Sequence, residues 1–253
     1  MNDPTCFREM TALVTGASSG IGAATALALG ARGAAVQIHY NCQKEAAAAV
    51  LRRVRESGGD GALVQADLSI MDGLRSLTRQ MDGRIIDILV NNAGSLIRRT
   101  PVLDLSEELW EQMMMLNLSS TFFLTKAILP CMVARKRGFV VNISSVAART
   151  GGGLGALAYA AAKGAVSTMT KSLATEFAPL GVRINAVSPG TVDTNYHRHF
   201  SDEQMLSAVR AATPLRRIGT PEEIADVIVF LCTEQARFIH GQVIEVNGGF
   251  LMV

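Results

Sequence analysis

The chain has 253 residues, of which 49% are hydrophobic and 18% charged, so it can bury a large core and lacks the composition of a disordered protein. Its formal net charge of +2 gives no reason to expect binding to nucleic acid or to a membrane surface. Four widely spaced cysteines without a CxxC pair, no signal-peptide pattern and no run of about 18 apolar residues indicate one cytoplasmic domain, residues 1–253, without a zinc site or a membrane span.

The first apolar run, Met10–Thr15, leads directly into a glycine-rich turn. The letters TGASSGIG at positions 15–22 stand between this strand-like run and an Ala-rich, helix-forming segment. The glycines permit a tight turn, close approach of the backbone to a pyrophosphate and close packing of the helix, whose first N–H groups can bind an anion. A plain strand-to-helix turn is the alternative. The residues assigned to a dinucleotide are Gly16, Ser18, Ser19, Gly20, Ile21 and Gly22.

The second predicted strand, Ala34–Tyr40, ends without the acidic residue that usually binds the adenosine ribose. Counting about 20 residues from the glycines reaches His39, Tyr40 and Asn41. A carboxylate there would repel a ribose 2′-phosphate, and its absence admits one, with Lys44 near enough to help. We therefore favour NADP(H) over NAD(H), with Tyr40 and Asn41 at the cofactor. Alternatively, Tyr40 only covers the adenine.

A helix over Gln43–Ser57 and a third strand, Gly61–Ala66, come next, and Asp67-Leu68 follow at the carboxyl end of that strand. Both residues are assigned to the cofactor site. Asp67 either accepts a hydrogen bond from the adenine amino group or caps the helix that runs through Met81, and the sequence leaves the two alternatives even.

The fourth predicted strand, Ile85–Val90, runs into Asn91-Asn92-Ala93-Gly94, a turn sequence that suits close contact with a ligand. A long helix is then predicted over Ser106–Arg135, with Ser106 as its cap. Its methionines at 113–115 are expected in the core or at a subunit contact. Asn117 is the odd polar residue on this helix.

A fifth strand, Phe139–Ile143, ends in Ser144-Ser145 and precedes an Ala-rich helix that extends to about Ala178. Tyr159 and Lys163 are four residues apart on that helix and so share one face. A phenol ordinarily has a pKa near ~10, and an ammonium beside it favours the phenolate. The pair could thus be a tuned proton donor, although such pairs are also common on helix surfaces.

The C-terminal region contains a sixth strand, Val182–Val187, a helix capped by Thr220 that runs to Cys232, and a last strand, Gln242–Val246. Residues 190–220 have no regular pattern, and we expect a lid or substrate loop there.

His197 and His199 have metal-ligand spacing, but the sequence offers no third ligand, so we predict no metal site. The alternation of strands and helices predicts an α/β fold: a doubly wound, Rossmann-type, seven-stranded parallel sheet with helices on both faces. Ligands bind such sheets at the carboxyl ends of their strands, where the polar motifs fall.

The ordered motifs resemble those of the short-chain dehydrogenase/reductase family. TGASSGIG, NNAG, Asn117, the set Ser145, Tyr159 and Lys163, and SPGTVDT at 188–194 carry the resemblance, which covers nearly the whole chain from Met10 to Phe250. Within the family the nearest likeness is to bacterial 3-oxoacyl-acyl-carrier-protein reductases and related ketoreductases and sugar dehydrogenases.

The resemblance implies four catalytic residues. Tyr159 would donate a proton to the carbonyl oxygen as hydride arrives from the nicotinamide. Lys163 would lower the pKa of that phenol and bind the nicotinamide ribose. Ser145 would bond the substrate oxygen, and Asn117 would hold a water that links Lys163 to solvent. Ser145 is preferred to Ser144 because the family places this serine about 13 residues before the tyrosine, although here the separation is 14 (159 minus 145).

Further cofactor contacts follow from the same resemblance. The adenosine side would involve Asn91, Ala93 and Gly94. The carboxamide and phosphate side would involve Pro189, Gly190, Val192 and Thr194. The family is often tetrameric, so we expect a homotetramer or a homodimer.

The leading functional hypothesis is an NADPH-dependent carbonyl reductase of a 3-oxoacyl thioester or similar small ketone, possibly carrier-bound. A sugar or polyol dehydrogenase that uses NAD(P) is the second, and a non-catalytic dinucleotide sensor is a remote third. Arg135-Lys136-Arg137 could dock an acidic carrier, and Arg98-Arg99 could meet an anionic substrate, but solvated charges are favoured for both. Thr175 stands before Glu176 where acyl-carrier reductases often have a basic residue.

Overall fold

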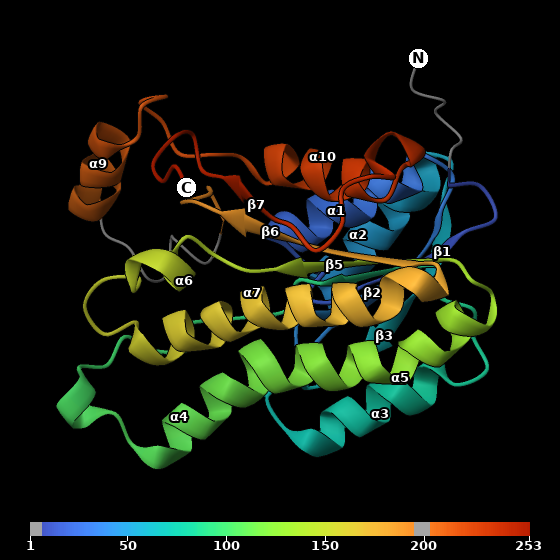
Figure 1. Ribbon diagram of the computed structural model, residues 1–253, viewed down its shortest axis with the longest axis horizontal. Coiled ribbons are helices and arrows are strands. Elements are labelled where there is room, and N and C mark those ends of the chain that lie inside the picture. The colour runs from blue at the N-terminus through green and yellow to red at the C-terminus, as the bar shows by residue number, and fades with distance from the viewer. Residues whose placement is uncertain (1–6, 195–202) are drawn as a thin grey trace.

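Seven parallel strands form one sheet in the order β3-β2-β1-β4-β5-β6-β7 (Figure 1). The computed structural model describes residues 7–194 and 203–253, so His197 and His199 lie outside the described residues. Strands that are covered on both faces are expected to be almost continuously apolar, and β5 is buried at every position. The strands are β1 Thr11–Val14, β2 Ala35–Tyr40, β3 Asp60–Gln65, β4 Ile88–Asn91, β5 Gly138–Ile143, β6 Val182–Pro189 and β7 Val243–Val246.

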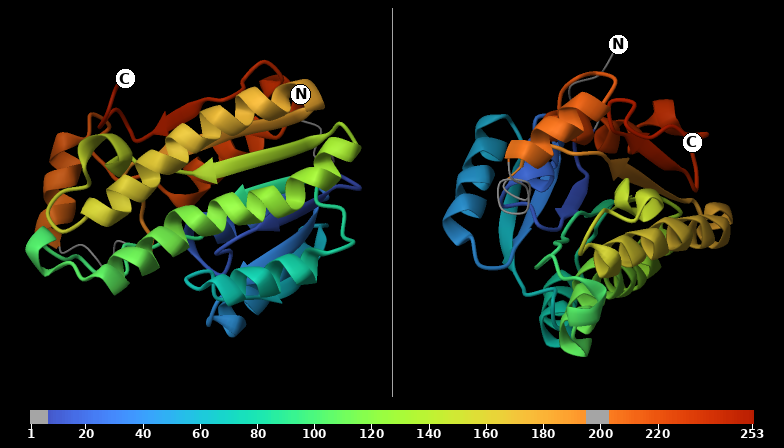
Figure 2. Two further views of the ribbon diagram at one scale, coloured as in Figure 1. Left: turned by 60° about the horizontal axis from the view of Figure 1, so that its bottom comes forward. Right: turned by 90° about the vertical axis from the view of Figure 1, so that its left-hand side faces the viewer.

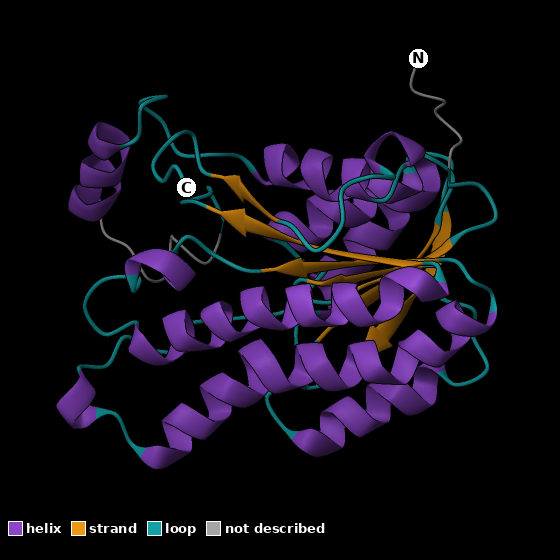
Figure 3. Ribbon diagram, viewed as in Figure 1, coloured by secondary structure: helices purple, strands orange, loops and turns teal. Residues whose placement is uncertain are grey.

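Helices cover both faces of this sheet, as Figure 3 shows by colour. On one face α1, α2 and α10 enclose a core that includes Leu29, Val54 and Ile228, and on the other α3, α5 and α7 enclose a core that includes Leu77 and Leu124. The described helices are α1 Gly20–Gly30, α2 Lys44–Glu56, α3 Met71–Met81, α4 Glu107–Met114, α5 Ser120–Ala134, α6 Ala147–Thr150, α7 Leu157–Phe177, α9 Glu203–Ala212 and α10 Pro221–Leu231.

The single-domain, doubly wound fold predicted from the sequence is confirmed, with its elements in the predicted order. The predicted caps are also present: the Ser106 hydroxyl accepts from the Leu109 N–H, and Thr220 and Glu223 form a capping box at the start of α10.

Two predictions about the elements were wrong. The fourth strand begins at Ile88 rather than Ile85, whose side chain is 55% exposed. The segment 190–220 was expected to be irregular, yet it contains the amphipathic helix α9. Its apolar residues follow amphipathic helical spacing, although none of its residues is fully buried.

α4 and α5 form one continuous helix joined by a π-helical turn, Met115–Ser119 (Figure 2). Within the described residues this helix, Glu107–Ala134, alone is long and apolar enough to cross a membrane, since an 18-residue window of it has a mean hydropathy of 1.3. That is weak evidence, because core helices pass the same test and 44% of that window is buried in the fold. The segment contains no unbroken apolar run, which is why no span was expected there.

The sheet order reverses between β1 and β4. β1 leads to β2 and β3 on one side, and the chain then crosses to β4 and the strands beyond it. Loops that leave neighbouring strands in opposite directions open a crevice at such a point, outside the carboxyl ends of the strands.

Candidate active site

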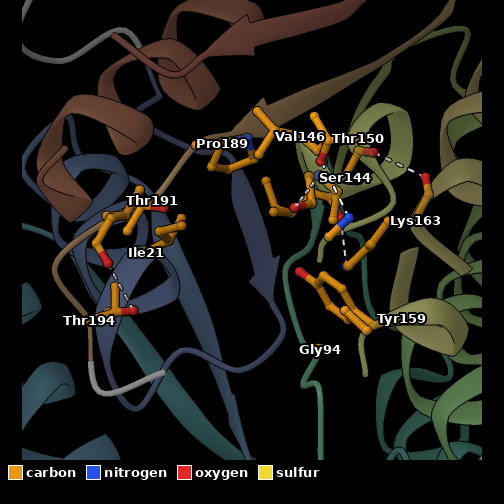
Figure 4. A pocket seen from close by; sticks show the side chains of 18 of the residues that line it. Ile21, Gly94, Ser144, Val146, Thr150, Tyr159, Lys163, Pro189, Thr191 and Thr194 are labelled. Carbon is orange, nitrogen blue, oxygen red and sulfur yellow. Dashed lines mark hydrogen bonds between the residues drawn. The ribbon is translucent and has the colours of Figure 1, made fainter. Parts of the chain in front are cut away.

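A cleft of about 540 Å³ lies at this crevice. Its walls come from the loops after β1, β4, β5 and β6, from α7 and from α9 (Figure 4). Among the predicted site residues, those that line the cleft are Gly16, Ser19, Gly20, Ile21, Gly94, Ser145, Tyr159, Lys163, Pro189, Gly190, Val192 and Thr194.

The glycine turn after β1 is shaped so that side chains are excluded. A Cβ at Gly22 would lie 2.3 Å from the Gly16 carbonyl oxygen, and Gly16 itself has φ +63°. The Asn92 side-chain amide donates to the carbonyl oxygens of Thr15 (2.8 Å) and Gly16 (3.2 Å), which fixes the turn from the β4 side. The first residues of α1 follow this turn, so a pyrophosphate fits the cradle sterically and electrostatically.

Tyr159 and Lys163 project into the cleft from α7, one turn apart (Figure 4). The Lys163 ammonium lies 5.7 Å from the centre of the Tyr159 ring. Lys163 is 3% exposed and donates to the Ile143 carbonyl at the end of β5 over 2.8 Å. Burial lowers the pKa of Lys163 from 10.5 to about 8, because the charged form loses hydration.

The structure separates the two candidate serines. Ser144 is 2% exposed, and its hydroxyl shares a hydrogen bond of 2.7 Å with Ser167 and lies 3.1 Å from the Lys163 carbonyl oxygen, to which it donates. Ser145 lines the cleft, and its oxygen accepts from the Ala147 N–H over 3.1 Å, so its own proton can be donated to a ligand. Both serines line the cleft, but the Ser144 hydroxyl is bonded within the protein, so Ser145 is the one of the two with a proton to donate into the cleft, despite the spacing of 14.

Asn117 is fully buried in the π-helical turn. Its amide donates to the carbonyls of Ser95 (2.8 Å) and Met113 (2.9 Å), and its oxygen accepts from the Ser95 N–H (3.0 Å). Both amide protons are thus in use. The side chain holds the loop after β4 against α4, and the role predicted for Asn117 in holding a water remains a prediction.

Gly94 lies where Asn117 and Lys163 converge. A Cβ at this position would lie 2.8 Å from the Asn117 side-chain oxygen and 3.1 Å from the Lys163 nitrogen. Any side chain here would therefore displace one of the two residues, which gives the glycine of the NNAG sequence a steric reason.

Several residues predicted on the adenosine side point elsewhere. The Asn91 amide is buried and donates to Thr125 (2.9 Å) and Asn142 (2.8 Å), so Asn92 rather than Asn91 lines the cleft. Tyr40 is 7% exposed and packs in the core, which removes the interpretation that its ring covers an adenine.

Asp67 does not cap the following helix, which begins at Met71. Its carboxylate instead accepts from the backbone N–H (2.9 Å) and hydroxyl (2.7 Å) of Ser69, and the contact predicted with adenine remains a prediction. Contacts of the cofactor with Asn41 and Ala93 also remain predictions. Leu68, which was also assigned to the cofactor site, is buried, with only 3% of its surface exposed.

On the opposite side, the loop after β6 closes over the glycine turn. A Cβ at Gly20 would lie 3.1 Å from the Thr194 methyl, and Val192 pairs with Gly219 in an isolated bridge. Ser18 lies outside the cleft, and its hydroxyl donates to Gln43 over 3.4 Å.

The far wall of the cleft was missed by the sequence analysis. Met205, Leu206 and Val209 of α9 and Phe250 near the C-terminus line it with apolar side chains. Arg99 also lines the cleft, and its guanidinium donates to the Leu154 carbonyl over 3.0 Å. Amphipathic spacing in α9 could have indicated this wall, whereas nothing in the sequence placed Phe250, which comes from the far end of the chain.

Within residues 7–194 and 203–253, no three His, Cys, Asp or Glu side chains cluster as a metal site requires. The described groups instead comprise a phenol beside a buried ammonium, a serine hydroxyl, and a glycine cradle for a pyrophosphate. A carbonyl that accepts hydride develops negative charge on its oxygen, and such donors stabilise that charge. Fold and site together define a dinucleotide-dependent oxidoreductase.

Comparisons with known proteins support the same class. A family model described as enoyl-(acyl carrier protein) reductase matches residues 16–251. A 3-oxoacyl-[acyl-carrier-protein] reductase of Synechocystis is 41% identical over 251 residues, covering 98% of this chain and 99% of that protein. The chain belongs to the short-chain dehydrogenase/reductase family, whose members use NAD(P)(H).

Two solved structures extend the comparison. A putative NAD(P)-dependent gluconate 5-dehydrogenase from Beutenbergia cavernae, with bound NADP, has a TM-score of 0.90 and 34% identity over 98% of both chains. A 3-oxoacyl-[acyl-carrier protein] reductase from Brucella melitensis, with bound NAD, has a TM-score of 0.90 and 32% identity, covering 99% of this chain and 94% of that one.

Proposed function

We propose that the protein is an NADPH-dependent reductase that converts the ketone of a 3-oxoacyl thioester, or of a similar small molecule, into a secondary alcohol. The observation that carries the proposal is the composition of the cleft, which is lined by Tyr159 and Ser145 together with apolar side chains from α9 and Phe250. Apolar side chains suit an acyl group better than a chain of hydroxyl groups, which would lose hydrogen bonds to water there.

Each residue would have a separate role in the reduction. NADPH, when bound, supplies a hydride from C4 of its nicotinamide ring. Ser145 donates a hydrogen bond to the carbonyl oxygen and orients it, and Tyr159 transfers its phenolic proton to that oxygen. Lys163 favours the resulting phenolate through its charge.

The preference for NADPH rests on the end of β2. Asn41 is exposed there, and no carboxylate stands at positions 39–41 to repel a ribose 2′-phosphate. Lys44, the first residue of α2, contributes an exposed positive charge nearby in sequence. The bound NADP and NAD in the two relatives show that the fold accommodates either cofactor.

A panel assay tests the proposal. The purified enzyme is given NADPH or NADH with an acetoacetyl thioester, with a simple ketone and with keto sugars, and the alcohols with NADP⁺ or NAD⁺ are tested in reverse. We expect the highest kcat/KM for the thioester with NADPH. Activity confined to sugars or sugar acids would overturn the substrate assignment without affecting the assignment to the family.

One observation favours a second candidate, a dehydrogenase or reductase of sugar acids. Arg99 brings a positive charge to the cleft wall, close to the loop that precedes Tyr159, and could bind a substrate carboxylate. The structural relative named as a gluconate 5-dehydrogenase is consistent with this alternative. A keto acid in the panel addresses it directly, and Arg99→Met should raise the KM of that acid selectively.

We do not propose that an acidic carrier binds at Arg135-Lys136-Arg137. Arg135 forms an ion pair with the buried Asp87, and the three residues directly precede β5, at the edge of the sheet opposite the cleft. A carrier bound there would be remote from Tyr159. If the substrate is carrier-bound, the carrier must approach from the carboxyl edge of the sheet.

We further propose a homotetramer, or a homodimer, that acts in the cytoplasm. Phe122 and Phe123 on α5 and Phe238 after α10 are exposed apolar side chains of the kind that subunit contacts cover. Among the described residues, Cys42 and Cys131 are free thiols, which suits a reducing compartment. The presence of both Tyr159 and Lys163 argues against a non-catalytic dinucleotide sensor.

A further inference from the structure

His39 lies at the carboxyl end of β2, beside the glycine turn, and is 2% exposed. Its Nδ1 accepts from the backbone N–H of Gly16 over 3.1 Å, and its Nε2 lies 3.1 Å from the Ala66 carbonyl oxygen. The His39 carbonyl also accepts from the Ala17 N–H over 2.8 Å. A single buried residue therefore ties the pyrophosphate turn to the end of β3.

These partners define the tautomer of the ring. Because Nδ1 faces a donor, it must carry a lone pair, and because Nε2 faces a carbonyl, it must carry the proton. A second proton would place an N–H against the Gly16 N–H. The surroundings of the ring also favour its neutral form. Burial lowers the pKa of His39 from 6.5 to about 4, although the Ala66 carbonyl and the Asp67 charge act to raise it.

The residues at either end of this bridge belong to the predicted adenosine half of the cofactor site. Gly16 begins the pyrophosphate cradle, and Ala66 directly precedes Asp67, the predicted adenine contact. Asn92 fixes the same turn from β4 through the Thr15 and Gly16 carbonyls, so the turn is held from both neighbouring strands. Preorganising these backbone groups lowers the cost of ordering them around a ligand.

We infer that His39 is a positioning residue for the cofactor, whose neutral ring sets the glycine turn, and with it the spacing between the pyrophosphate and adenine subsites. It acts through the Gly16 and Ala66 backbone groups and does not touch the reacting atoms. Loss of the bridge should therefore weaken binding of the adenosine diphosphate part of the cofactor and leave the chemical step unchanged.

Three substitutions separate the two hydrogen bonds. An Asn side-chain oxygen is as many bonds from Cα as Nδ1, so His39→Asn can keep the acceptor for Gly16. A Gln nitrogen matches Nε2 in the same way, so His39→Gln can keep only the donor to Ala66. His39→Val removes both bonds and remains apolar and β-compatible.

A matched control comes from His240, which forms a similar bridge away from the cleft. Its Nδ1 accepts from the Ile184 N–H (3.3 Å), and its Nε2 lies 2.7 Å from the Ala174 carbonyl oxygen. His240→Gln reports the general effect of breaking a histidine bridge between backbone groups.

The measurement is the Kd of ADP and of NADPH by calorimetry, with melting temperatures and with kcat at saturating cofactor. We expect His39→Gln and His39→Val to raise both Kd values about tenfold, as for a buried hydrogen bond lost at a binding site. His39→Asn should stay within about threefold of wild type, and His240→Gln should leave the Kd values unchanged. The kcat of each folded variant should change less than about twofold.

Two results would overturn the inference: ADP affinity that is unchanged in His39→Gln, or His39→Asn as weak as His39→Val. Equal losses in kcat and in ADP affinity across all variants would show a general structural role instead. ADP binding needs no substrate, so it tests His39 separately from the proposed ketone reduction. If His39→Val does not fold, the ADP affinities of His39→Asn and His39→Gln still test the inference.

Discussion

Replacing Lys163 by methionine should stabilise the protein at neutral pH while removing most of its activity. Burial holds the pKa of Lys163 at about 8 instead of 10.5, which corresponds to a cost of about 3 kcal/mol for the buried ammonium at pH 7. Methionine has a similar length and no such cost. It also leaves the Ile143 carbonyl without its donor, which costs about 1 to 2 kcal/mol.

The balance is a gain of about 1 to 2 kcal/mol at pH 7, or a rise in Tm of about 2 to 6 °C for a domain of this size. The stability that Lys163→Met gains over the wild type must decrease as pH rises. The unfolded chain keeps the lysine protonated up to about 10.5, whereas the folded protein releases the proton near 8, so between these values the wild type gains stability with pH. Near pH 10 only about 1 kcal/mol of the ammonium cost remains, and the lost hydrogen bond then offsets the gain.

The assay is thermal unfolding of the cofactor-free protein at fixed concentration, at pH 7 and pH 10, followed through the single tryptophan, Trp110, and by calorimetry. Lys171→Met is the control, because Lys171 is on the same helix but exposed. A difference between Lys163→Met and wild type that is the same at both pH values would refute the reasoning. So would a pH-dependent difference in the Lys171 control.

Substitutions at four further positions test the site. Tyr159→Phe should keep cofactor affinity within about twofold and lower kcat by at least about 10²- to 10⁴-fold, and equal turnover would remove the proton-donor role. Ser145→Ala should lower kcat/KM about tenfold or more through the lost hydrogen bond. Ser144→Ala, which removes the buried hydrogen bonds of Ser144 to Ser167 and to the Lys163 carbonyl, should mainly lower Tm, and the reverse pattern would exchange the two serines. Asn41→Asp should lower the NADPH-to-NADH ratio of kcat/KM about tenfold, with neutral Asn41→Ser near wild type, and an unchanged ratio would place the ribose elsewhere.

The fold was predictable because its elements carry strong local signals. The glycine turn at 15–22 stands between an apolar run and a helix, and several strands of the parallel sheet are marked by short apolar runs. The pair Tyr159 and Lys163 was predictable because helical spacing alone puts residues four apart on one face. These features depend on neighbours in sequence.

What the sequence missed depends on neighbours in space. Asn91 and Asn92 are adjacent, but successive side chains at the end of a strand point to opposite faces. A shift of one residue in the prediction was therefore enough to select the asparagine that does not line the cleft. Tyr40 looked available because it ends a strand, but it packs in the core with residues of α2 and is buried. The bridge made by His39 was invisible because its partners, Gly16 and Ala66, are 23 and 27 residues away.

The π-helical turn at Met115–Ser119 holds one residue more than a regular α-helical turn would. Each residue of an α-helix advances by about 100°, and the wider turn absorbs the extra residue so that the segments on either side keep their phase. Removal of a single residue within the turn would therefore restore regular winding without rotating α4 against α5, but Asn117 would lose the wide turn that places its side chain against Ser95. The effect of such a deletion would fall on the loop after β4 rather than on the long helix.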